Sequence, residues 1–529
     1  MNVDPHSTTY KQYRAPKQHG DALICPPSNQ AGKLISGNQS LQQKQGTFAS
    51  IRDRARSHLV TAALKYTREY RDIAIGDNLI SRPIVMSGHQ PTLFHPGVWF
   101  KNFALSKIAE QQNAVPINLV IDNDAAASSE IRVPVIDSLS GKAKYRSIAF
   151  DRLGGGVPYE QFNLSDPSRF ESFPNRVTEC IRSLVETPCV NPLWMHARAA
   201  IQRSMNVGTI FSEARHSLEA HCGLETLELP LSTICESNTF SEFALMILDD
   251  LPRFHECYNE SIEDYRLAHR IRSTSHPVPN LQTNDEWHEA PFWIYGEDNP
   301  KRRPAWIRKA GKRLIISDGE QRERVITLTE PTESSDAFHE MTDDQFKIRP
   351  RALITTMYAR IILSDLFLHG IGGGKYDQLG DRIIRRFFSF NPPHFTVISA
   401  TATLPVSQKV DNQIEINRIQ RTIRDTVYQP ETFAQEMNLP ETLITQKQSL
   451  LTHIPKRGQR KQWHLEMESL NKKLAKHLLV KRNQLRGELQ SKQIESNSAR
   501  ILANREHPFC LFDLNHLNEV FESMLLEAN

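Results

Sequence analysis

Two short apolar runs with a helical pattern between them are the clearest feature of the chain. Residues 83–86 (PIVM) and 115–121 (VPINLVI) are mostly apolar, and polar residues follow each run. Between them, residues 98–113 (VWFKNFALSKIAEQQN) place apolar side chains at helical spacing and contain neither Gly nor Pro. A strand, a helix and a second buried strand in close succession predict a βαβ unit with parallel strands.

The same patterns predict further elements. Residues 1–50 are rich in Gln, Ser, Asn, Lys and Pro and lack apolar clusters, so we expect a disordered tail. The other predicted elements are an amphipathic helix at 51–73, a hairpin at 132–150, several helices at 166–272, a strongly apolar helix at 351–368, and a core strand from His394.

The elements divide the chain into segments. After the tail, we expect the first part of a parallel-sheet core at 51–150 and its second part at 336–405, separated by a helical insertion at 151–275 and a small β-rich insertion at 276–335. Residues 406–529 form an α-helical hairpin and a C-terminal tail. Two apolar stripes predict this hairpin, one from Ile416 to Val427 and one from Leu470 to Leu489.

Composition narrows the class of protein. The chain has 529 residues, 64 basic and 61 acidic side chains, and a net charge of +3, which does not favour a dedicated nucleic-acid binder. Seven cysteines without a C-x-x-C pair argue against a disulfide framework and a structural zinc site. With no apolar run of membrane-spanning length and no secretory signal, we expect a soluble, cytoplasmic, multi-domain protein.

The ends of the two predicted strands carry the first candidate site. His89, Gln90, Pro91 and Gly97 lie between the first strand and its helix, where backbone amides and His89 would contact an anion or His89 would act as a general acid. Asp122 and Asp124 end the second strand and would orient an amine or bind a cation. The alternatives are ordinary hydrogen bonds of a loop and helix caps, and two histidines at this spacing give no reason to assign a metal.

A glycine-rich segment supplies the second candidate site. His369, Gly370, Gly372, Gly373, Gly374 and Lys375 lie between two predicted helices, where successive glycines would let amides converge on an anion and Lys375 would add charge. The segment is one residue short of a Walker A loop and lacks its Ser or Thr, which excludes a P-loop NTPase. Arg382, on the following helix, is a further candidate binding residue; the alternative for that helix is a solvated face with structural ion pairs.

Several of these segments are similar to one known family. From about residue 80 to 515, the chain resembles in segments the cysteine-adding enzymes of bacillithiol biosynthesis. The segments that carry the resemblance are GHQPTLFHPGVWFKN with VPINLVIDND, HEAPFWIYG with KRLIISDG, HGIGGGKYDQLGDRIIRRFF, and the NREHPFCLF ending. The resemblance implies a Rossmann-like, nucleotidyltransferase-like core with insertions and a C-terminal coiled-coil hairpin. It also implies amide formation between the cysteine carboxyl group and the amine of a glucosaminyl malate. The family usually has Glu-Asp-His-Asp where this chain has Asp122-Asn123-Asp124-Ala125, so we expect a diverged substrate.

The sequence thus favours a ligase that joins a carboxylate to an amine. We expect His89, Asp122, Asp124 and Lys375 to take part in catalysis, and a nucleotide such as ATP or ADP with magnesium as the cofactor. The alternative is a non-catalytic binding or assembly protein that forms a homodimer through the coiled coil. A weaker alternative is RNA binding by the basic segment 453–506, which has 13 Lys and Arg against 5 Asp and Glu.

Overall fold

The structure, a computed structural model, describes residues 10–74, 76, 78–152, 155–270, 278–405, 412–458 and 460–527. These residues group into two units. The core unit comprises the described parts of Met1–Val133, Ser147–Thr403 and Arg505–Asn529, and the helical unit those of Pro134–Arg146 and Leu404–Asn504.

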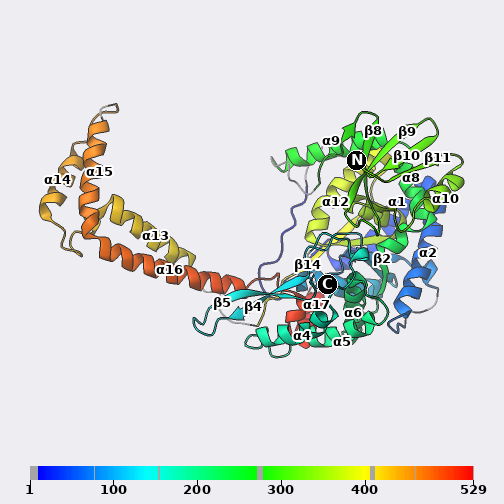
Figure 1. Cartoon of the computed structure of the whole chain (residues 1–529), viewed down its shortest axis with the longest axis horizontal. Helices are drawn as coiled ribbons and strands as arrows, with labels where there is room; N and C mark the ends of the chain where they lie inside the picture. Colours follow the sequence, from blue (N-terminus) through cyan, green and yellow to red (C-terminus); the bar gives the residue numbers. More distant parts are fainter. Residues whose placement is uncertain are drawn as a thin grey trace. The chain divides into compact units, whose positions relative to one another are not determined.

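The core unit is mixed α/β (Figure 1). It is built on a six-stranded main sheet with the strand order β1-β14-β13-β2-β3-β6. Neighbouring strands from β14 to β6 run parallel, and β1 pairs with β14 antiparallel. This confirms the α/β class and the predicted strands near 83–86, at 115–121 and after His394. The strands are β1 (Ala22–Cys25), β2 (Ile84–His89), β3 (Val115–Val120), β6 (Leu227–Pro230), β13 (Leu366–His369) and β14 (Phe395–Ala400).

The connections leave the centre of this sheet in two directions. From β2 the chain passes through α3 (Pro96–Gln111) to β3, and from β13 through α12 (Ile371–Ile383) to β14, which lies on the other side of β2. Because such crossovers are right-handed, α3 and α12 cover opposite faces of the sheet. The carboxyl ends of β2 and β13 therefore form a topological switch point, where open parallel sheets usually bind their ligands.

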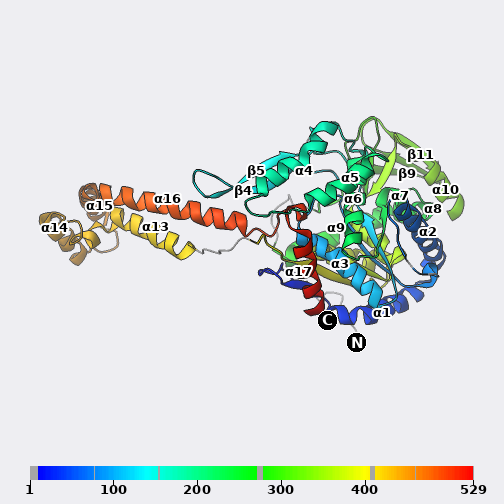
Figure 2. The same ribbon diagram turned by 90° about the horizontal axis from the view of Figure 1, so that it is seen from below.

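Each face of the sheet is covered by its own helices. On the α12 side, Leu379 and Ile383 share a buried cluster with residues of α2 (Ala49–Arg68) and α8 (Asn238–Leu248). On the α3 side lies α17 (Leu514–Glu527) (Figure 2). The rings of Phe100 and Phe103 in α3 pack against Phe521 of α17. The remaining helices of the core unit are α1 (Ala31–Gln43), α4 (Pro167–Ile181), α5 (Val190–Ile201), α6 (Val207–His221), α7 (Leu231–Cys235), α9 (Leu251–Ala268), α10 (Pro331–Glu340) and α11 (Ala352–Tyr358).

A second, antiparallel sheet has the order β11-β10-β9-β8-β12, with β7 paired to β8. Strands β7 to β11 fall within 276–335, where we predicted a β-rich insertion. The last strand of this sheet, however, comes from the segment that we assigned to the parallel core. The strands are β7 (Thr283–Asn284), β8 (Trp287–Tyr295), β9 (Arg303–Ala310), β10 (Arg313–Ser317), β11 (Glu323–Thr327) and β12 (Lys347–Pro350).

The prediction of a disordered tail is wrong for residues 10–50, while residues 1–9 lie outside the described residues. β1 extends the main sheet, and α1 is held by polar side chains that bond to core backbone. Asn38 Nδ2 donates to the carbonyl oxygens of Asp365 at 2.7 Å and His394 at 2.9 Å. Such bonds leave no apolar pattern in the sequence, which explains the error.

Asp365 fixes the start of the central strand pair. Its carboxylate accepts from the Ile84 amide at 2.8 Å and pairs with Arg56 at 3.1 Å, while its own amide donates to the Ile84 carbonyl at 2.8 Å. The side chain is 1% exposed. Because an uncompensated buried carboxylate would be costly, these partners set the register of β2 against β13.

The predicted helix at 351–368 is also partly wrong. α11 continues as a wider helical turn to Leu363, but Leu366–His369 is strand β13, and α12 begins at Ile371. The glycine-rich segment therefore joins a strand to a helix and lies largely in the first turn of α12. The apolar helix runs into the apolar strand with only two residues between them, so the sequence pattern shows no break.

The helical unit contains the hairpin β4 (Glu130–Ile136) and β5 (Ala143–Ala149) in part, together with α13 (Gln413–Tyr428), α14 (Glu441–Thr452), α15 (Arg460–His477) and α16 (Leu479–Leu502). The hairpin was predicted at this place. α13 packs along α16, and Phe433, Leu439, Leu474 and Leu478 form a small buried cluster. The segment 505–527, assigned to this appendage by sequence, belongs to the core unit.

No helix among the described residues is long and apolar enough to cross a bilayer.

Two glycines in the first turn of α12 should respond in opposite ways to alanine. A Cβ at Gly374 would overlap the Val397 side chain of β14, whereas a Cβ at Gly372 would meet nothing within 4 Å. We expect Gly374→Ala to lower the free energy of unfolding by about 1–3 kcal/mol, and Gly372→Ala to leave it unchanged or raise it by up to about 1 kcal/mol. Urea unfolding of both variants checks this; equal effects would contradict the packing of α12 on β14.

Candidate functional site

His89 is the last residue of β2 and lies at the switch point. Because the Gln90 carbonyl oxygen, 2.9 Å away, can only accept, His89 Nδ1 carries the proton and Nε2 offers a lone pair. Burial and the nearby Lys101 lower the pKa of His89 to about 3. The imidazole is therefore neutral at pH 7, which contradicts its predicted role as an acid and makes it an acceptor instead.

Lys101 of α3 lies against the same strand end. Its Nζ donates to the Gly88 carbonyl at 2.5 Å, and the residue is 3% exposed. Burial, with Arg215 nearby, lowers the pKa of Lys101 to about 7. Sequence reasoning missed this lysine, although a single charge within the apolar run VWFKNFAL was a signal of an internal position.

Gln90 and Asp124 do come together, as their positions at neighbouring strand ends predicted. Gln90 Nε2 donates to Asp124 Oδ2 at 2.6 Å, and Arg302 pairs with Oδ1 at 2.7 Å. Asp124 remains 35% exposed and Arg302 23%, so both can meet a ligand. Arg302 precedes strand β9 of the second sheet and lies over the Trp293 ring, 5.2 Å from its centre. No pattern in the sequence predicted that Arg302 lies near Asp124.

Asp122 is placed differently from the prediction. It is buried, and its carboxylate accepts from both the backbone amide (3.0 Å) and the hydroxyl of Ser232 at the start of α7. Burial and Glu160 raise the pKa of Asp122 to about 7. Its oxygens therefore hold the ends of β3 and β6 together, and are not free for an amine or a cation.

The first turn of α3 is closed by the protein itself. His95 caps the helix by accepting from the Gly97 amide at 3.1 Å, and burial beside Arg505 lowers the pKa of His95 to about 4. A Cβ at Gly97 would overlap the Ala400 carbonyl, so the glycine permits close packing of α3 on the end of β14. Pro91 is buried. The prediction that the Gly97 amide faces an anion is therefore wrong.

The first turn of α12 is more open. Gly370 is the N-cap and none of the glycines from 370 to 374 has a left-handed backbone, so the convergence of amides through unusual turns is not observed. Gly373 makes room for His369 Nδ1, which a Cβ would approach to 2.9 Å. A Cβ at Gly370 or Gly372 would meet nothing within 4 Å. Lys375, half-buried, follows in the same turn.

His369 ends β13 and is oriented by a buried carboxylate. Its Nε2 lies 2.8 Å from Asp377 Oδ2, and Arg360 pairs with the same oxygen at 2.5 Å. Although burial opposes it, Arg360 and His369 hold the pKa of Asp377 below its usual range. Burial lowers the pKa of His369 itself. The ionised Asp377 therefore keeps a proton on Nε2 and leaves Nδ1 as an acceptor beside the first turn of α12.

Arg382 does not join the site. Its guanidinium pairs with Asp264 of α9 at 2.7 Å and lies over the Tyr10 ring, 5.1 Å from its centre. Arg382 therefore helps to hold α12 against α9, which agrees with the alternative that this helix carries structural ion pairs.

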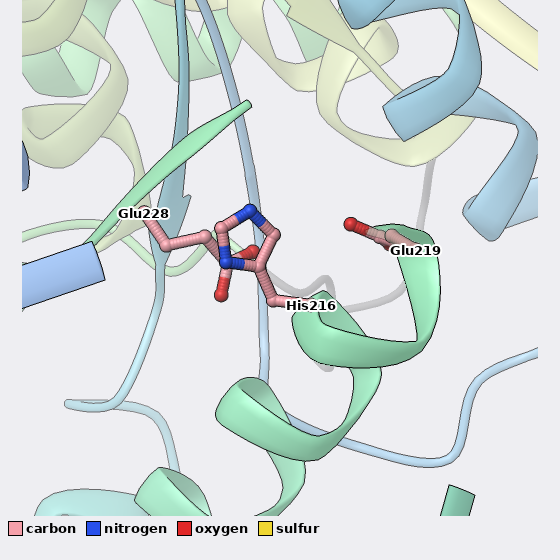
Figure 3. Close-up of side chains that lie close together, drawn as sticks. All are labelled: His216, Glu219 and Glu228. Carbon is pink, nitrogen blue, oxygen red and sulfur yellow. The ribbon is translucent and has the colours of Figure 1, made fainter. Parts of the chain in front are cut away.

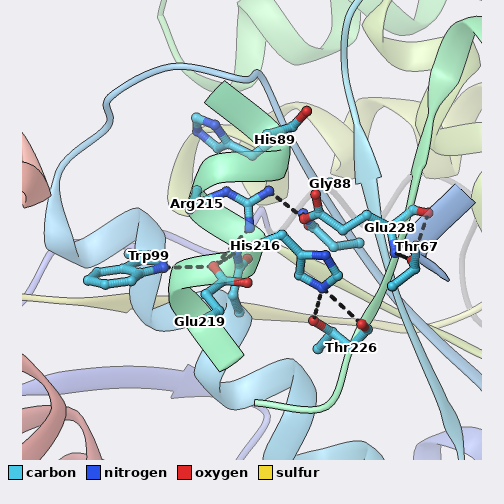
Figure 4. A network of polar contacts seen from close by, with 12 residues as sticks. Thr67, Gly88, His89, Trp99, Arg215, His216, Glu219, Thr226 and Glu228 are labelled. Carbon is cyan, nitrogen blue, oxygen red and sulfur yellow. Dashed lines mark hydrogen bonds and ion pairs between the residues drawn. The ribbon is translucent and has the colours of Figure 1, made fainter. Parts of the chain in front are cut away.

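A buried polar network lies on the α3 side of the sheet (Figure 4). Arg215 of α6 pairs with both Glu219, at 2.8 Å, and Glu228 of β6. Burial raises the pKa of Glu228 to about 7. The carboxylates also accept from Trp99 Nε1 (2.7 Å), Asn102 Nδ2 (2.7 Å) and Asn118 Nδ2 (2.5 Å). The network ties α3, α6, β3 and β6 together behind the strand ends.

His216, Glu219 and Glu228 lie close enough to consider a shared ion (Figure 3). However, His216 Nε2 must donate to the Thr226 carbonyl at 2.8 Å, so Nδ1 accepts from the Tyr70 hydroxyl at 2.8 Å. Both ring nitrogens are thereby engaged, and Arg215 already supplies the cation between the glutamates. We assign no metal centre to this cluster.

No known protein-family model matches this sequence, and no curated protein matches it.

Acid should destabilise the fold through His89. Because its pKa is about 3 in the folded state and about 6.5 when unfolded, the unfolded state binds more protons between these values. We expect the free energy of unfolding to fall with decreasing pH, and His89→Gln to reduce this slope by up to about 1.4 kcal/mol per pH unit below pH 6. Asp122, whose raised pKa acts in the opposite direction, titrates in both proteins and cancels in the difference.

Urea titrations from pH 7 to pH 4.5 measure the slope. His477→Gln, which alters an exposed histidine of α15, is the matched control and should keep the wild-type slope. An unchanged slope in His89→Gln would contradict the neutral, buried His89.

Proposed function

We propose that this protein is an enzyme that joins a carboxylate to an amine, with the reaction at the switch point. The observation that carries the proposal is that polar and charged side chains flank the switch point on both sides. On one side, His89, Gln90 and Asp124 lie at the ends of β2 and β3. On the other side, His369 and the open first turn of α12 follow β13. A Rossmann-like core with a coiled-coil hairpin, as in the cysteine-adding enzymes of bacillithiol biosynthesis, accounts for this arrangement.

The α12 side suits an anion. The first turn of a helix presents unpaired amides and a partial positive charge, and side chains are absent at Gly370 and Gly372. Lys375, half-buried in the same helix, adds a cationic group near the neutral imidazole of His369. A phosphate of a magnesium nucleotide fits such a position, and that nucleotide would supply the leaving group that activates the carboxylate.

The Asp124 side suits an amine. Its partly exposed carboxylate, held by Gln90, can orient an ammonium or an amine through charge-assisted hydrogen bonds. The lone pair on His89 Nε2 can accept a hydrogen bond from the amine and so orient it. When the amine attacks the activated carboxyl carbon it must lose a proton, and this proton goes to the departing phosphate group or to water. Arg302, beside Asp124, would pair with a carboxylate on the amine-bearing substrate.

The alternative is a non-catalytic assembly protein, and the homodimer through the helical unit stays a prediction for either function. It is favoured by apolar side chains that the described residues leave exposed on the long helices, namely Ile414 at 82%, Leu479 at 52% and Val480 at 66%. This alternative gives no reason for the clustered acceptors at the switch point, so we retain the enzyme as the principal proposal.

Turnover tests the proposal directly. We expect the protein, given cysteine, glucosaminyl malate, ATP and magnesium, to form the amide, with other amino acids and amino sugars tested because the substrate has diverged. Mass spectrometry of the products measures the reaction. Asp124→Asn should lower kcat/KM by about 100-fold or more, the usual effect of losing a charged contact to the reacting groups.

Asp264→Asn is the matched control. Asp264 is also a partly exposed carboxylate paired with an arginine, but it lies on α9 with Arg382. It should keep wild-type turnover. Equal losses in the two variants would place the reaction elsewhere, and absence of any amide product across the substrate panel would favour the non-catalytic alternative.

A further inference from the structure

The loop between α14 and α15, together with the first turn of α15, carries a basic cluster. Lys456, Arg457, Arg460 and Lys461 are all exposed, and the sequence has no acidic residue from 451 to 465. We call the described residues of 451–465 the basic tip. It lies at one end of the helical unit (Figure 1).

The charges of the basic tip are not balanced within the unit. Elsewhere in the helical unit several lysines have acidic partners, such as Lys472 with Glu468 at 2.7 Å and Lys481 with Glu436 at 2.6 Å. Among the described residues, none of the four basic residues of the tip forms an ion pair; Arg460 instead donates through Nε to the Pro455 carbonyl at 2.9 Å. The positive potential is therefore available to an external partner.

Apolar side chains lie exposed among these charges. Leu451 is 43% exposed, Ile454 55% and Leu465 54%. The half-buried Trp463 donates to the Leu450 carbonyl at 2.8 Å, which ties the start of α15 to the end of α14. The basic tip thus presents basic and aliphatic side chains together, on a segment that the Trp463 hydrogen bond holds in place. This combination of charge and apolar surface indicates which class of partner the tip binds.

We propose that the basic tip docks on an anionic phospholipid surface. Lysine and arginine side chains are attracted to anionic headgroups, and neighbouring aliphatic side chains enter the interface beneath them. A nucleic acid would satisfy the charges but leave Leu451, Ile454 and Leu465 in water, and single-stranded nucleic acid is bound chiefly through stacked aromatic rings. The contact is peripheral and independent of the reaction proposed for the core unit.

Vesicle binding tests this inference with the full chain. We expect sedimentation with vesicles of phosphatidylglycerol and phosphatidylcholine in equal parts, no binding to pure phosphatidylcholine, and weaker binding at high salt. Each basic residue near an anionic surface contributes roughly fivefold to binding, so K456E/R457E, which reverses two charges, should reduce it by 25-fold or more. Ile454→Ser should reduce it further with no change in charge.

Two control variants match these changes elsewhere in the unit. R421E/R424E reverses two exposed arginines of α13, and Ile494→Ser alters an exposed isoleucine of α16. Both should bind vesicles as the wild type does, and circular dichroism should show the same helical content in all variants.

Three results would overturn the inference. Equal losses in K456E/R457E and R421E/R424E would indicate attraction to the whole protein. Unchanged binding in Ile454→Ser would remove the apolar contact that singles out a membrane. Retention by RNA, lost in K456E/R457E, with no binding to anionic vesicles, would make the partner a nucleic acid.

Discussion

The clamp formed by Asp365 is the interaction on which the candidate site depends. Its backbone and carboxylate hold Ile84 by two hydrogen bonds of 2.8 Å, and Arg56 and Asn38 occupy its remaining acceptors. β2 and β13 are buried on both faces along most of their length, so no alternation of apolar and polar side chains distinguishes one register from another. With the register fixed, His89 and His369 reach the same edge of the sheet from opposite sides of the switch point.

Burial then determines what these side chains can do. The imidazoles of His89 and His369 are neutral because desolvation and nearby cations disfavour a second proton. Each imidazole donates a hydrogen bond from one ring nitrogen, to Gln90 in the case of His89 and to Asp377 in the case of His369. The other ring nitrogen of each therefore has a free lone pair in a fixed orientation. The positive charge of the region comes instead from Lys375 and the start of α12. Hydrogen-bond acceptors and anion-binding groups are therefore separate, which suits a site that holds an amine beside a carboxylate.

The sequence predicted those parts of the fold whose pattern is local. The strand at 115–120, its helix and the β-rich insertion were recognisable because each has its own period and breakers. β6 and β13 were missed because four residues beside a helix show no distinct period. The order of residues 10–50 was missed because Asn38 holds them by polar bonds to core backbone, and their few buried apolar side chains, such as Ile35 and Phe48, are too widely spaced to form a pattern. Likewise, the proximity of Gln90 and Asp124 was predictable because both follow strands of the main sheet. The position of Arg302 was not, because this residue precedes a strand of the second sheet.

The most direct test of the account is hydrogen exchange of the full chain with and without ATP, magnesium and cysteine. The account predicts that the ligands slow exchange chiefly in peptides covering 88–98 and 366–376, the two sides of the switch point. It also predicts little change in the helical unit. Protection confined to other parts of the chain, or no protection with any carboxylate and nucleotide tried, would contradict a catalytic site at the ends of β2 and β13.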